Sequence, residues 1–183
     1  MDFPEYSRLP EQYKLSLPED AGVTDGIIHQ MSEAVNAFKF LCSVMKERLE
    51  EKTGYPEKIF PRINCVIDKF PDFPMDGNEV AGSIRESIIA LAADGHRTGI
   101  HLILITQRSE RRILPKQLTD CFPTKIAFRV ALENDSKAIL GKAGAEMLTG
   151  NGDMLMLYKG ATARLQVPLV THDDIRAAVD NLL

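Results

Sequence analysis

Two short apolar runs in this sequence end in polar side chains that could do chemistry. Residues 61–73 read PRINCVIDKFPDF, so an apolar stretch delivers the carboxylate of Asp68, with Lys69 beside it. A second run, IHLILI, is followed by TQR, which includes Gln107. A carboxylate is a hard oxygen ligand of the kind that Mg²⁺ prefers, and a nearby amide could orient water or sense a phosphate. In the alternative interpretation, Asp68 is a turn or capping residue. Gln107 is then a polar residue at a strand end whose hydrogen bonds are made within the fold.

The elements that must position these groups alternate between strand and helix. The run at 100–105 is almost continuously apolar, which is typical of a strand covered on both faces of a parallel sheet. Helical spacing of apolar residues predicts a helix from Thr24 or Asp25, as cap, to about residue 51, and a second helix over 79–93. Further strands are expected at 63–67, 124–130, 154–158 and 161–167, and further helices at 136–148 and 173–183. This order predicts an α/β domain whose working residues lie at the carboxyl ends of its strands.

Composition sets broad limits on the kind of protein. Of 183 residues 44% are hydrophobic, enough for one substantial core, and the formal net charge of -4 argues against a globally basic nucleic-acid binder. No apolar run approaches the ~20 residues that span a bilayer. The first residues lack the features of a signal peptide, so a cytoplasmic location is expected. Three widely spaced cysteines predict reduced thiols. Residues 1–23, rich in proline and charge, predict an extended lead-in.

A phosphate-binding loop of the form GxxxxGK[ST] is absent from the sequence. The segment GKAG at 141–144 has a lysine but no serine or threonine after it, and it falls in or after a predicted helix rather than after a strand. Backbone N–H groups of such a loop bind the phosphates of a nucleotide. We therefore expect this chain to bind ATP poorly by itself.

From residue 61 to about 155 the chain resembles the motor domain of the FtsK/SpoIIIE family of hexameric DNA translocases. PRINCVIDKFPDF is similar to the family's Walker B segment, and ADGHRTGIHLILITQRS at 93–109 to its next strand. The segments that follow in the family's order are FPTKIAFRV (122–130), NDSKAIL (134–140) and GAEMLTGNGDML (144–155). The resemblance implies a RecA-like P-loop NTPase core, α/β with a mostly parallel sheet and flanking helices. It covers only the later part of a motor, so residues 24–183 are expected to form a partial motor domain without the phosphate-loop strand and helix.

The chain departs from the family pattern at Lys69, which stands where the Walker B segment has a catalytic glutamate. A carboxylate can accept a proton from water, whereas a lysine ammonium has no acceptor. Loss of such a base removes about 10²–10⁴-fold of rate. Asp72 could take over this role only from several residues past the strand end. We expect no ATP hydrolysis by this chain alone. The family's usual arginine before the second strand is replaced by His96.

Basic side chains supply two further sets of candidates through the resemblance. One set could reach a neighbouring subunit's nucleotide as a trans-acting finger: Arg108, Lys125 and Arg129. The alternative for Arg129 is a strand-face residue paired with a carboxylate. The other set could contact DNA phosphates, or could equally be a solvated loop: Arg111, Arg112 and Lys116.

The resemblance implies ATP and Mg²⁺ as cofactors, with Asp68 as a magnesium ligand only when a nucleotide is bound. It implies double-stranded DNA as a partner, a homo- or hetero-oligomer, and a role in chromosome segregation and cell division. The missing motor half could come from another chain. In relatives the phosphate-loop strand lies beside the strand at 100–105, so we expect that edge to be filled by a neighbouring chain, a swapped segment or the lead-in. The alternative function is a degenerate ATPase or docking module of a secretion or conjugation machine.

Overall fold

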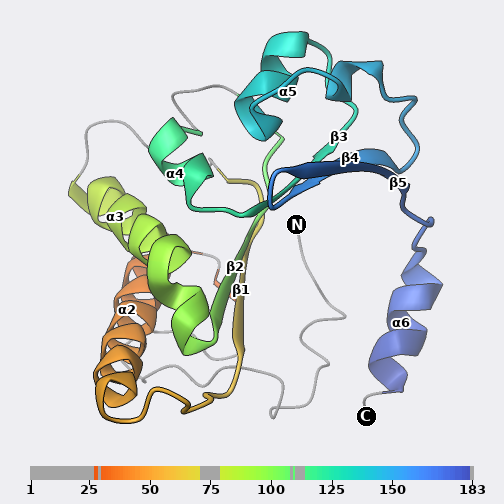
Figure 1. The fold of residues 1–183 in the computed structure, drawn as a ribbon. Coiled ribbons are helices and arrows are strands. Elements are labelled where there is room, and N and C mark those ends of the chain that lie inside the picture. Colours follow the sequence, from red (N-terminus) through yellow and green to blue (C-terminus); the bar gives the residue numbers. More distant parts are fainter. Residues whose placement is uncertain (1–26, 29, 71–78, 108, 110–113, 182–183) are drawn as a thin grey trace.

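The computed structural model describes residues 27–28, 30–70, 79–107, 109 and 114–181. Within these ranges the strands form two separate sheets, each covered by helices on one face (Figure 1). The predicted α/β class is confirmed. The lead-in at 1–23 lies outside the described residues.

The first unit is built on a parallel strand pair. β1 (Ile63–Ile67) and β2 (Ile100–Leu104) pair in register from Ile63 opposite Ile100 to Ile67 opposite Leu104. The helices α2 (Met31–Gly54) and α3 (Glu79–Asp94) lie side by side on one face of this pair (Figure 1). Their apolar stripes and the inward strand residues form the larger core, whose largest fully buried side chains include Phe70, Ile88, Leu91 and Ile100.

The first helix begins later than the sequence predicts. Thr24 and Asp25 lie outside the described residues, and Ile27 and Ile28 precede the helix in non-helical backbone. α2 begins at Met31 after Gln30, whose backbone N–H donates to Glu33 Oε2 at 3.1 Å. Glu33 thereby satisfies a donor that has no partner inside the helix, and this fixes the helix start at Gln30.

Gly95 and Gly99 make the tight connection between α3 and β2, through the 3₁₀ turn η3 (Gly95–Thr98). A Cβ at Gly95 would lie 2.9 Å from the carbonyl oxygen of Ile100, closer than side chains tolerate. Gly99 has φ 81°, in the left-handed region that favours glycine. The two glycines end the helix as predicted and let the chain turn directly into β2.

The second unit is an antiparallel sheet, which the sequence analysis did not predict. Its order is β3 (Thr124–Phe128), β4 (Asp153–Tyr158), β5 (Ala161–Gln166). The hairpin between β4 and β5 turns at Lys159 and Gly160, both with positive φ, as in a type I′ turn. One face packs on α5 (Glu133–Leu140) and on the 3₁₀ turn η4 (Ala145–Met147). The smaller core there buries Ala127, Leu140, Ala145 and Leu148.

The helix predicted over 136–148 stops at Leu140. Gly141 takes a left-handed conformation with φ 78°, which ends α5. The buried hydroxyl of Ser136 donates to the Lys142 carbonyl at 2.8 Å and accepts from the Ala145 N–H at 3.0 Å. Within the GKAG segment, the Gly141 N–H donates to the Lys137 carbonyl and the Gly144 N–H to Glu146 Oε2, so two of its amides are engaged by the chain itself.

Two further helices complete the described part. A short helix, α4 (Lys116–Asp120), links the two units and was not predicted. The closing helix α6 (His172–Asp180) starts at Thr171, whose hydroxyl accepts from the Asp174 N–H at 3.2 Å. None of the described helices combines the length and apolarity needed to cross a membrane.

The three cysteines are unpaired, as predicted: Cys42, Cys65 and Cys121. Burial raises the pKa of the Cys65 thiol to about 11 and also raises the pKa of Cys42. Both thiols therefore stay protonated and unreactive near neutral pH.

Candidate functional site

The carboxyl ends of β1 and β2 bring the two predicted polar groups to one edge of the sheet. The backbone pairing continues one step past the strands, because Ile105 N–H donates to the Ile67 carbonyl and Phe70 N–H donates to the Ile105 carbonyl, each at 2.9 Å. Asp68 and Gln107 leave the sheet directly beyond these bonds, and both are exposed. The predicted shared edge is present, although no hydrogen bond between the two side chains is found in the structure.

Asp68 and Lys69 form a sharp corner at the end of β1. The Lys69 N–H donates to Asp68 Oδ1 at 2.9 Å, and Lys69 has φ 53°, a left-handed conformation that is uncommon for lysine. Phe70, only 1% exposed, anchors the chain immediately afterwards. Residues held in such conformations cluster at functional sites, where the surrounding structure fixes them. The corner leaves both the carboxylate and the ammonium open to solvent.

This edge can supply only part of a magnesium site. One Asp68 oxygen accepts the Lys69 N–H, and the carboxylate stays exposed. No group of three His, Cys, Asp or Glu side chains suited to a metal ion occurs within the described ranges. Mg²⁺ prefers six oxygen ligands and often takes them from waters and phosphates rather than from protein. The residues present therefore fit a magnesium ion that a nucleotide brings with it, and not one held by protein alone.

The segment after β2 is tied to the second unit through a residue that the sequence analysis did not single out. Ser109 Oγ donates to Asp135 Oδ1, at the start of α5, at 2.5 Å. This bond links the chain that carries Gln107 to the helix covering β3. A serine two residues after a strand-end glutamine carries no sequence signal of its own, so only the structure reveals the link.

The trans-finger candidates lie in the second unit, apart from the Asp68 edge. Lys125 is half-buried in β3 opposite Leu157, and Arg129 follows the strand in an exposed position. Arg129 makes no ion pair with any residue that the structure describes, so the carboxylate partner of the alternative interpretation is not seen there. Its Cδ passes near Gly150, 3.8 Å from where a Cβ would stand. Arg108 lies outside the described residues.

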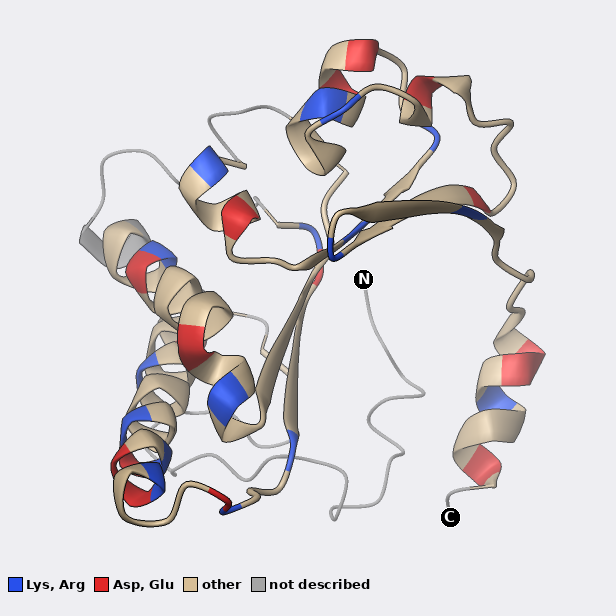
Figure 2. Ribbon diagram, in the orientation of Figure 1, with Lys and Arg blue, Asp and Glu red and all other residues tan. Residues whose placement is uncertain are grey.

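The DNA-contact candidates are only partly described. Arg111 and Arg112 fall outside the described ranges. Lys116, at the start of α4, pairs with Asp120 one turn later, and both side chains are largely exposed. Such surface pairs contribute little to stability, so Lys116 stays available to an anionic partner. Basic and acidic residues are interspersed along the described helices (Figure 2).

Asp153 is the buried carboxylate of the structure and has a structural role. It accepts from the Thr149 N–H at 2.8 Å and from two nitrogens of Arg164, Nε at 2.9 Å and Nη2 at 2.6 Å. The Arg164 guanidinium, with the Thr149 N–H, holds the pKa of Asp153 well below its usual range. Likewise the Gly144 N–H lowers the pKa of Glu146. Both carboxylates stabilise turns.

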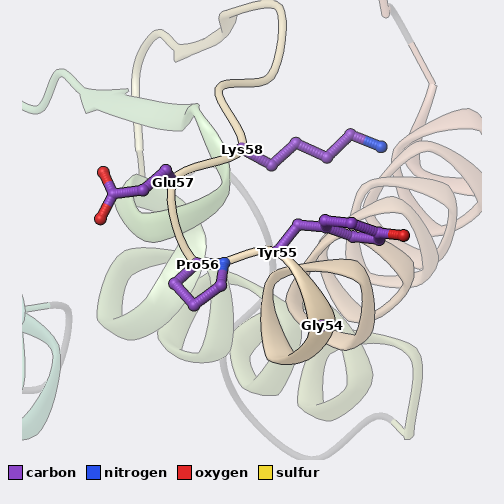
Figure 3. Close-up of a pocket in the computed structure, with 5 residues that line it drawn as sticks. All are labelled: Gly54, Tyr55, Pro56, Glu57 and Lys58. Carbon is purple, nitrogen blue, oxygen red and sulfur yellow. The ribbon is translucent and has the colours of Figure 1, made fainter.

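A pocket of about 620 Å³ lies in the turn after α2, away from this edge. Gly54, Tyr55, Pro56, Glu57 and Lys58 line it. Figure 3 shows Tyr55 and Lys58 directed to one side of the turn and Glu57 to the other. Lys58 pairs with Glu51 of α2. The turn leads into the amino end of β1, opposite to Asp68, so this pocket does not belong to the candidate site.

Comparison with known proteins supports the resemblance found in the sequence. No family model matches the chain. The chain is 39% identical to the DNA translocase FtsK of Vibrio vulnificus over 123 residues, which are 66% of this chain and 12% of that protein. It is 32% identical to the FtsK of Helicobacter pylori over 171 residues, 84% of this chain and 20% of the relative. The chain is a homologue of part of the FtsK DNA translocases. It spans about an eighth to a fifth of the length of these relatives.

Solved structures agree on the fold of this FtsK homologue. The conjugation coupling protein TcpA of pCW3, solved with ATPγS, has a TM-score of 0.75 at 23% identity over 85% of this chain and 50% of its own. The type VII secretion ATPase EccC of Thermomonospora curvata has a TM-score of 0.63 at 18% identity, over 85% of this chain and 21% of its own. These similarities confirm the predicted RecA-like ATPase fold.

Proposed function

We propose that this FtsK homologue is the later part of an ATP-driven DNA translocase motor that does not hydrolyse ATP by itself. The observation that supports this proposal is the exposed edge of the sheet at the carboxyl ends of β1 and β2. Asp68 and Gln107 stand there as in a nucleotide site, while Lys69 occupies the position that needs a base. Two amides of the GKAG loop already have partners within the chain, since the Gly141 N–H donates to the Lys137 carbonyl and the Gly144 N–H to Glu146 Oε2. The chain therefore holds the magnesium and sensing positions without the group that grips the triphosphate.

In this proposal each polar residue has a distinct role. When bound, ATP with Mg²⁺ supplies the phosphoryl group to be transferred. Asp68 accepts hydrogen bonds from water around the metal, and Gln107 orients water or senses the terminal phosphate. Arg129 is our first choice for a positive charge supplied to a neighbouring subunit's nucleotide, with Lys125 and Arg108 as the other candidates.

We also propose a partner, an oligomeric state and a cellular process for the chain. Double-stranded DNA is the partner, with Arg111, Arg112 and Lys116 as candidate phosphate contacts. The chain works in the cytoplasm within a homo- or hetero-oligomer, and its process is chromosome segregation and cell division.

A titration with a fluorescent ATP analogue, with and without Mg²⁺, tests the central claim. We expect no tight magnesium-dependent binding to the purified chain and no phosphate release, because neither a cradle nor a base is present. Asp68→Asn should leave the weak binding unchanged. Steady turnover by the purified chain, or tight binding that Asp68→Asn abolishes, would contradict the proposal.

A second candidate is a docking module of a secretion or conjugation machine. The fold similarity to TcpA and EccC favours it. A salt series of DNA-binding measurements separates the two functions. Affinity that falls steeply as salt rises indicates phosphate contacts and supports the translocase, because each neutralised phosphate adds to the salt slope. Absence of DNA binding at high micromolar protein supports the docking module.

A further inference from the structure

Helix α5 has side-chain contacts in both units of the structure. Ile139 packs against the larger core and against the smaller one. Ser136, a buried residue, bonds through its hydroxyl to the loop at 142–145 in the second unit. Asp135 accepts a hydrogen bond from Ser109, in the segment that leaves β2. The helix therefore lies where it can transmit a displacement from one unit to the other.

The hydrogen bond between Ser109 and Asp135 is of a strong kind. The hydroxyl oxygen and Asp135 Oδ1 are 2.5 Å apart, and both residues are half-buried. Hydrogen bonds from a hydroxyl to a carboxylate are shorter than those between neutral groups and about twice as strong. Partial burial strengthens this bond further, because the local dielectric constant is below that of water. Ser109 is therefore a fixed point on the segment after β2.

Gln107 lies between this fixed point and the last backbone bonds of the sheet. On one side, Ile105 donates to the Ile67 carbonyl and accepts from the Phe70 N–H, each at 2.9 Å. On the other side, two residues beyond Gln107, the Ser109 hydroxyl is bonded to α5. A short segment fixed at both ends has few backbone conformations, so the position of Gln107 depends on both anchors.

The carboxylate of Asp135 bonds across to the other unit rather than to its own helix. Asp135 is the third residue of α5, where an acidic side chain can form a capping box with the residue in front of the helix. A capping box needs a polar side chain there, but α5 has Leu132, with no side-chain cap bond. Capping of α5 therefore does not account for the bond from Ser109.

A further set of bonds connects α5 to the end of β3. The Ser136 hydroxyl, next to Asp135 in the helix, accepts from the Ala145 N–H at 3.0 Å. The Ala145 carbonyl in turn accepts from the Val130 N–H at 3.3 Å. Val130 directly follows Arg129, our first choice for a charge supplied to a neighbouring subunit. The segment after β2 and the end of β3 are thus linked by one series of bonds through α5.

We infer that Asp135 is a positioning residue, which holds Gln107 in place through Ser109. Through α5 it also fixes this segment relative to the end of β3, where Arg129 lies. This inference rests on the proposed function, in which Gln107 senses a phosphate or orients water. A phosphate that displaces Gln107 displaces Ser109 and hence α5, and the displacement reaches the end of β3 through Ala145. Asp135 thereby couples the nucleotide edge to the residue that serves a neighbouring subunit.

NMR relaxation of backbone amides in the whole chain tests the positioning of Gln107. In the unchanged chain we expect an order parameter of about 0.85 for the Gln107 amide, the value of rigid backbone. Ser109→Ala and Asp135→Ala each remove the bond and should lower this order parameter below about 0.6. Asp135→Asn keeps a side-chain oxygen as acceptor and should retain most of the original value. Ser109→Ala leaves α5 itself unchanged, so the test stands if Asp135→Ala does not fold.

A matched control and a second readout separate positioning from a general loss of structure. Glu133→Ala removes a carboxylate from the same turn of α5, one that pairs within the helix, and should leave the Gln107 order parameter unchanged. The second readout is hydrogen exchange of the Val130 amide, which lies in the other unit. Ser109→Ala should make this amide exchange at least about tenfold faster, because its acceptor Ala145 is held through α5.

Four outcomes decide the inference. An unchanged Gln107 order parameter in both Ser109→Ala and Asp135→Ala overturns it. An equal loss of order in Glu133→Ala overturns it in favour of a general effect of α5. A mobile Gln107 with an unchanged Val130 amide also overturns it, because the two ends would then be independent. The expected pattern together with ATP turnover by the purified chain upholds the positioning and overturns the proposed function instead.

Discussion

Lys69, just after β1, has a backbone conformation that glycine adopts with less strain. Its φ of 53° costs a side chain with a Cβ roughly 1–2 kcal/mol relative to right-handed backbone. The conformation persists because backbone hydrogen bonds to Ile105 fix Ile67 and Phe70 on either side of it.

Lys69→Gly should therefore stabilise the chain by about 0.5–1 kcal/mol, since glycine adopts positive φ without a clash. The Asp68 hydrogen bond uses the backbone N–H of residue 69 and survives the change. Urea unfolding measures the shift in midpoint. The same substitution at Lys46, inside α2, should cost about 1 kcal/mol. A loss of stability at both positions would show that Lys69 is not strained.

Asp153 makes stability depend on pH in a predictable direction. Its folded pKa lies below the unfolded value of about 3.9, so its contribution is fully present above that pH. The contribution is lost as pH falls from about 4 toward the folded pKa. Urea midpoints measured from pH 7 to pH 2.5 should fall steeply at the acid end. Asp153→Asn and Arg164→Met should each flatten that fall, and an unchanged slope in both variants would contradict this assignment.

At the scale of elements, one arginine joins helix α2 to the segments that precede both parallel strands. Arg48 Nη1, from α2, donates to the Pro61 carbonyl at 3.0 Å, just before β1, and to the Thr98 carbonyl at 2.8 Å, just before β2. Its guanidinium also lies 5.2 Å from the centre of the Phe60 ring. Helix α2, which covers the parallel pair, thus fixes the positions at which β1 and β2 begin.

Arg48→Met should lower the free energy of unfolding by about 1–3 kcal/mol, because it leaves two carbonyls without a charged donor. The matched control is Arg62→Met, an exposed arginine at the same connection, which should change stability by less than about 0.5 kcal/mol. Chemical denaturation of both variants provides the comparison. Equal losses would show that the two hydrogen bonds of Arg48 do not carry the effect.

The whole molecule contains two cores of unequal size. The larger core, between α2, α3 and the parallel pair, buries large side chains such as Phe70 and Leu91. The smaller core under α5 buries Ala127, Leu140, Ala145 and Leu148. The two sheets share no strand pairing among the described residues, so the units are joined there through side chains, such as Ile139, which packs against both cores, and Ser109, which bonds to Asp135.

We therefore expect the two units to open separately in the isolated chain. Hydrogen exchange under increasing urea should show the Ala127 and Leu155 amides opening at lower free energy than those of Ile67 and Ile103, because less apolar surface is buried around them. One common opening energy in the chain alone would contradict two independent units.

Much of this protein follows from local patterns in its sequence. The strands at 63–67 and 100–105 and the helix over 79–93 were all predicted, because the hydrophobic period acts over a few residues. The same local patterns predicted that Asp68 and Gln107 lie at strand ends. That Lys69 cannot accept a proton from water followed from its residue type alone.

Only the tertiary structure decided how these pieces meet. The start of α2 at Gln30 and the end of α5 at Leu140 depend on single hydrogen bonds and on one left-handed glycine. The antiparallel arrangement of β3 to β5 and the Ser109–Asp135 link depend on contacts between segments distant in sequence. Local patterns report which faces are apolar, but which partner covers them is a property of long-range contacts.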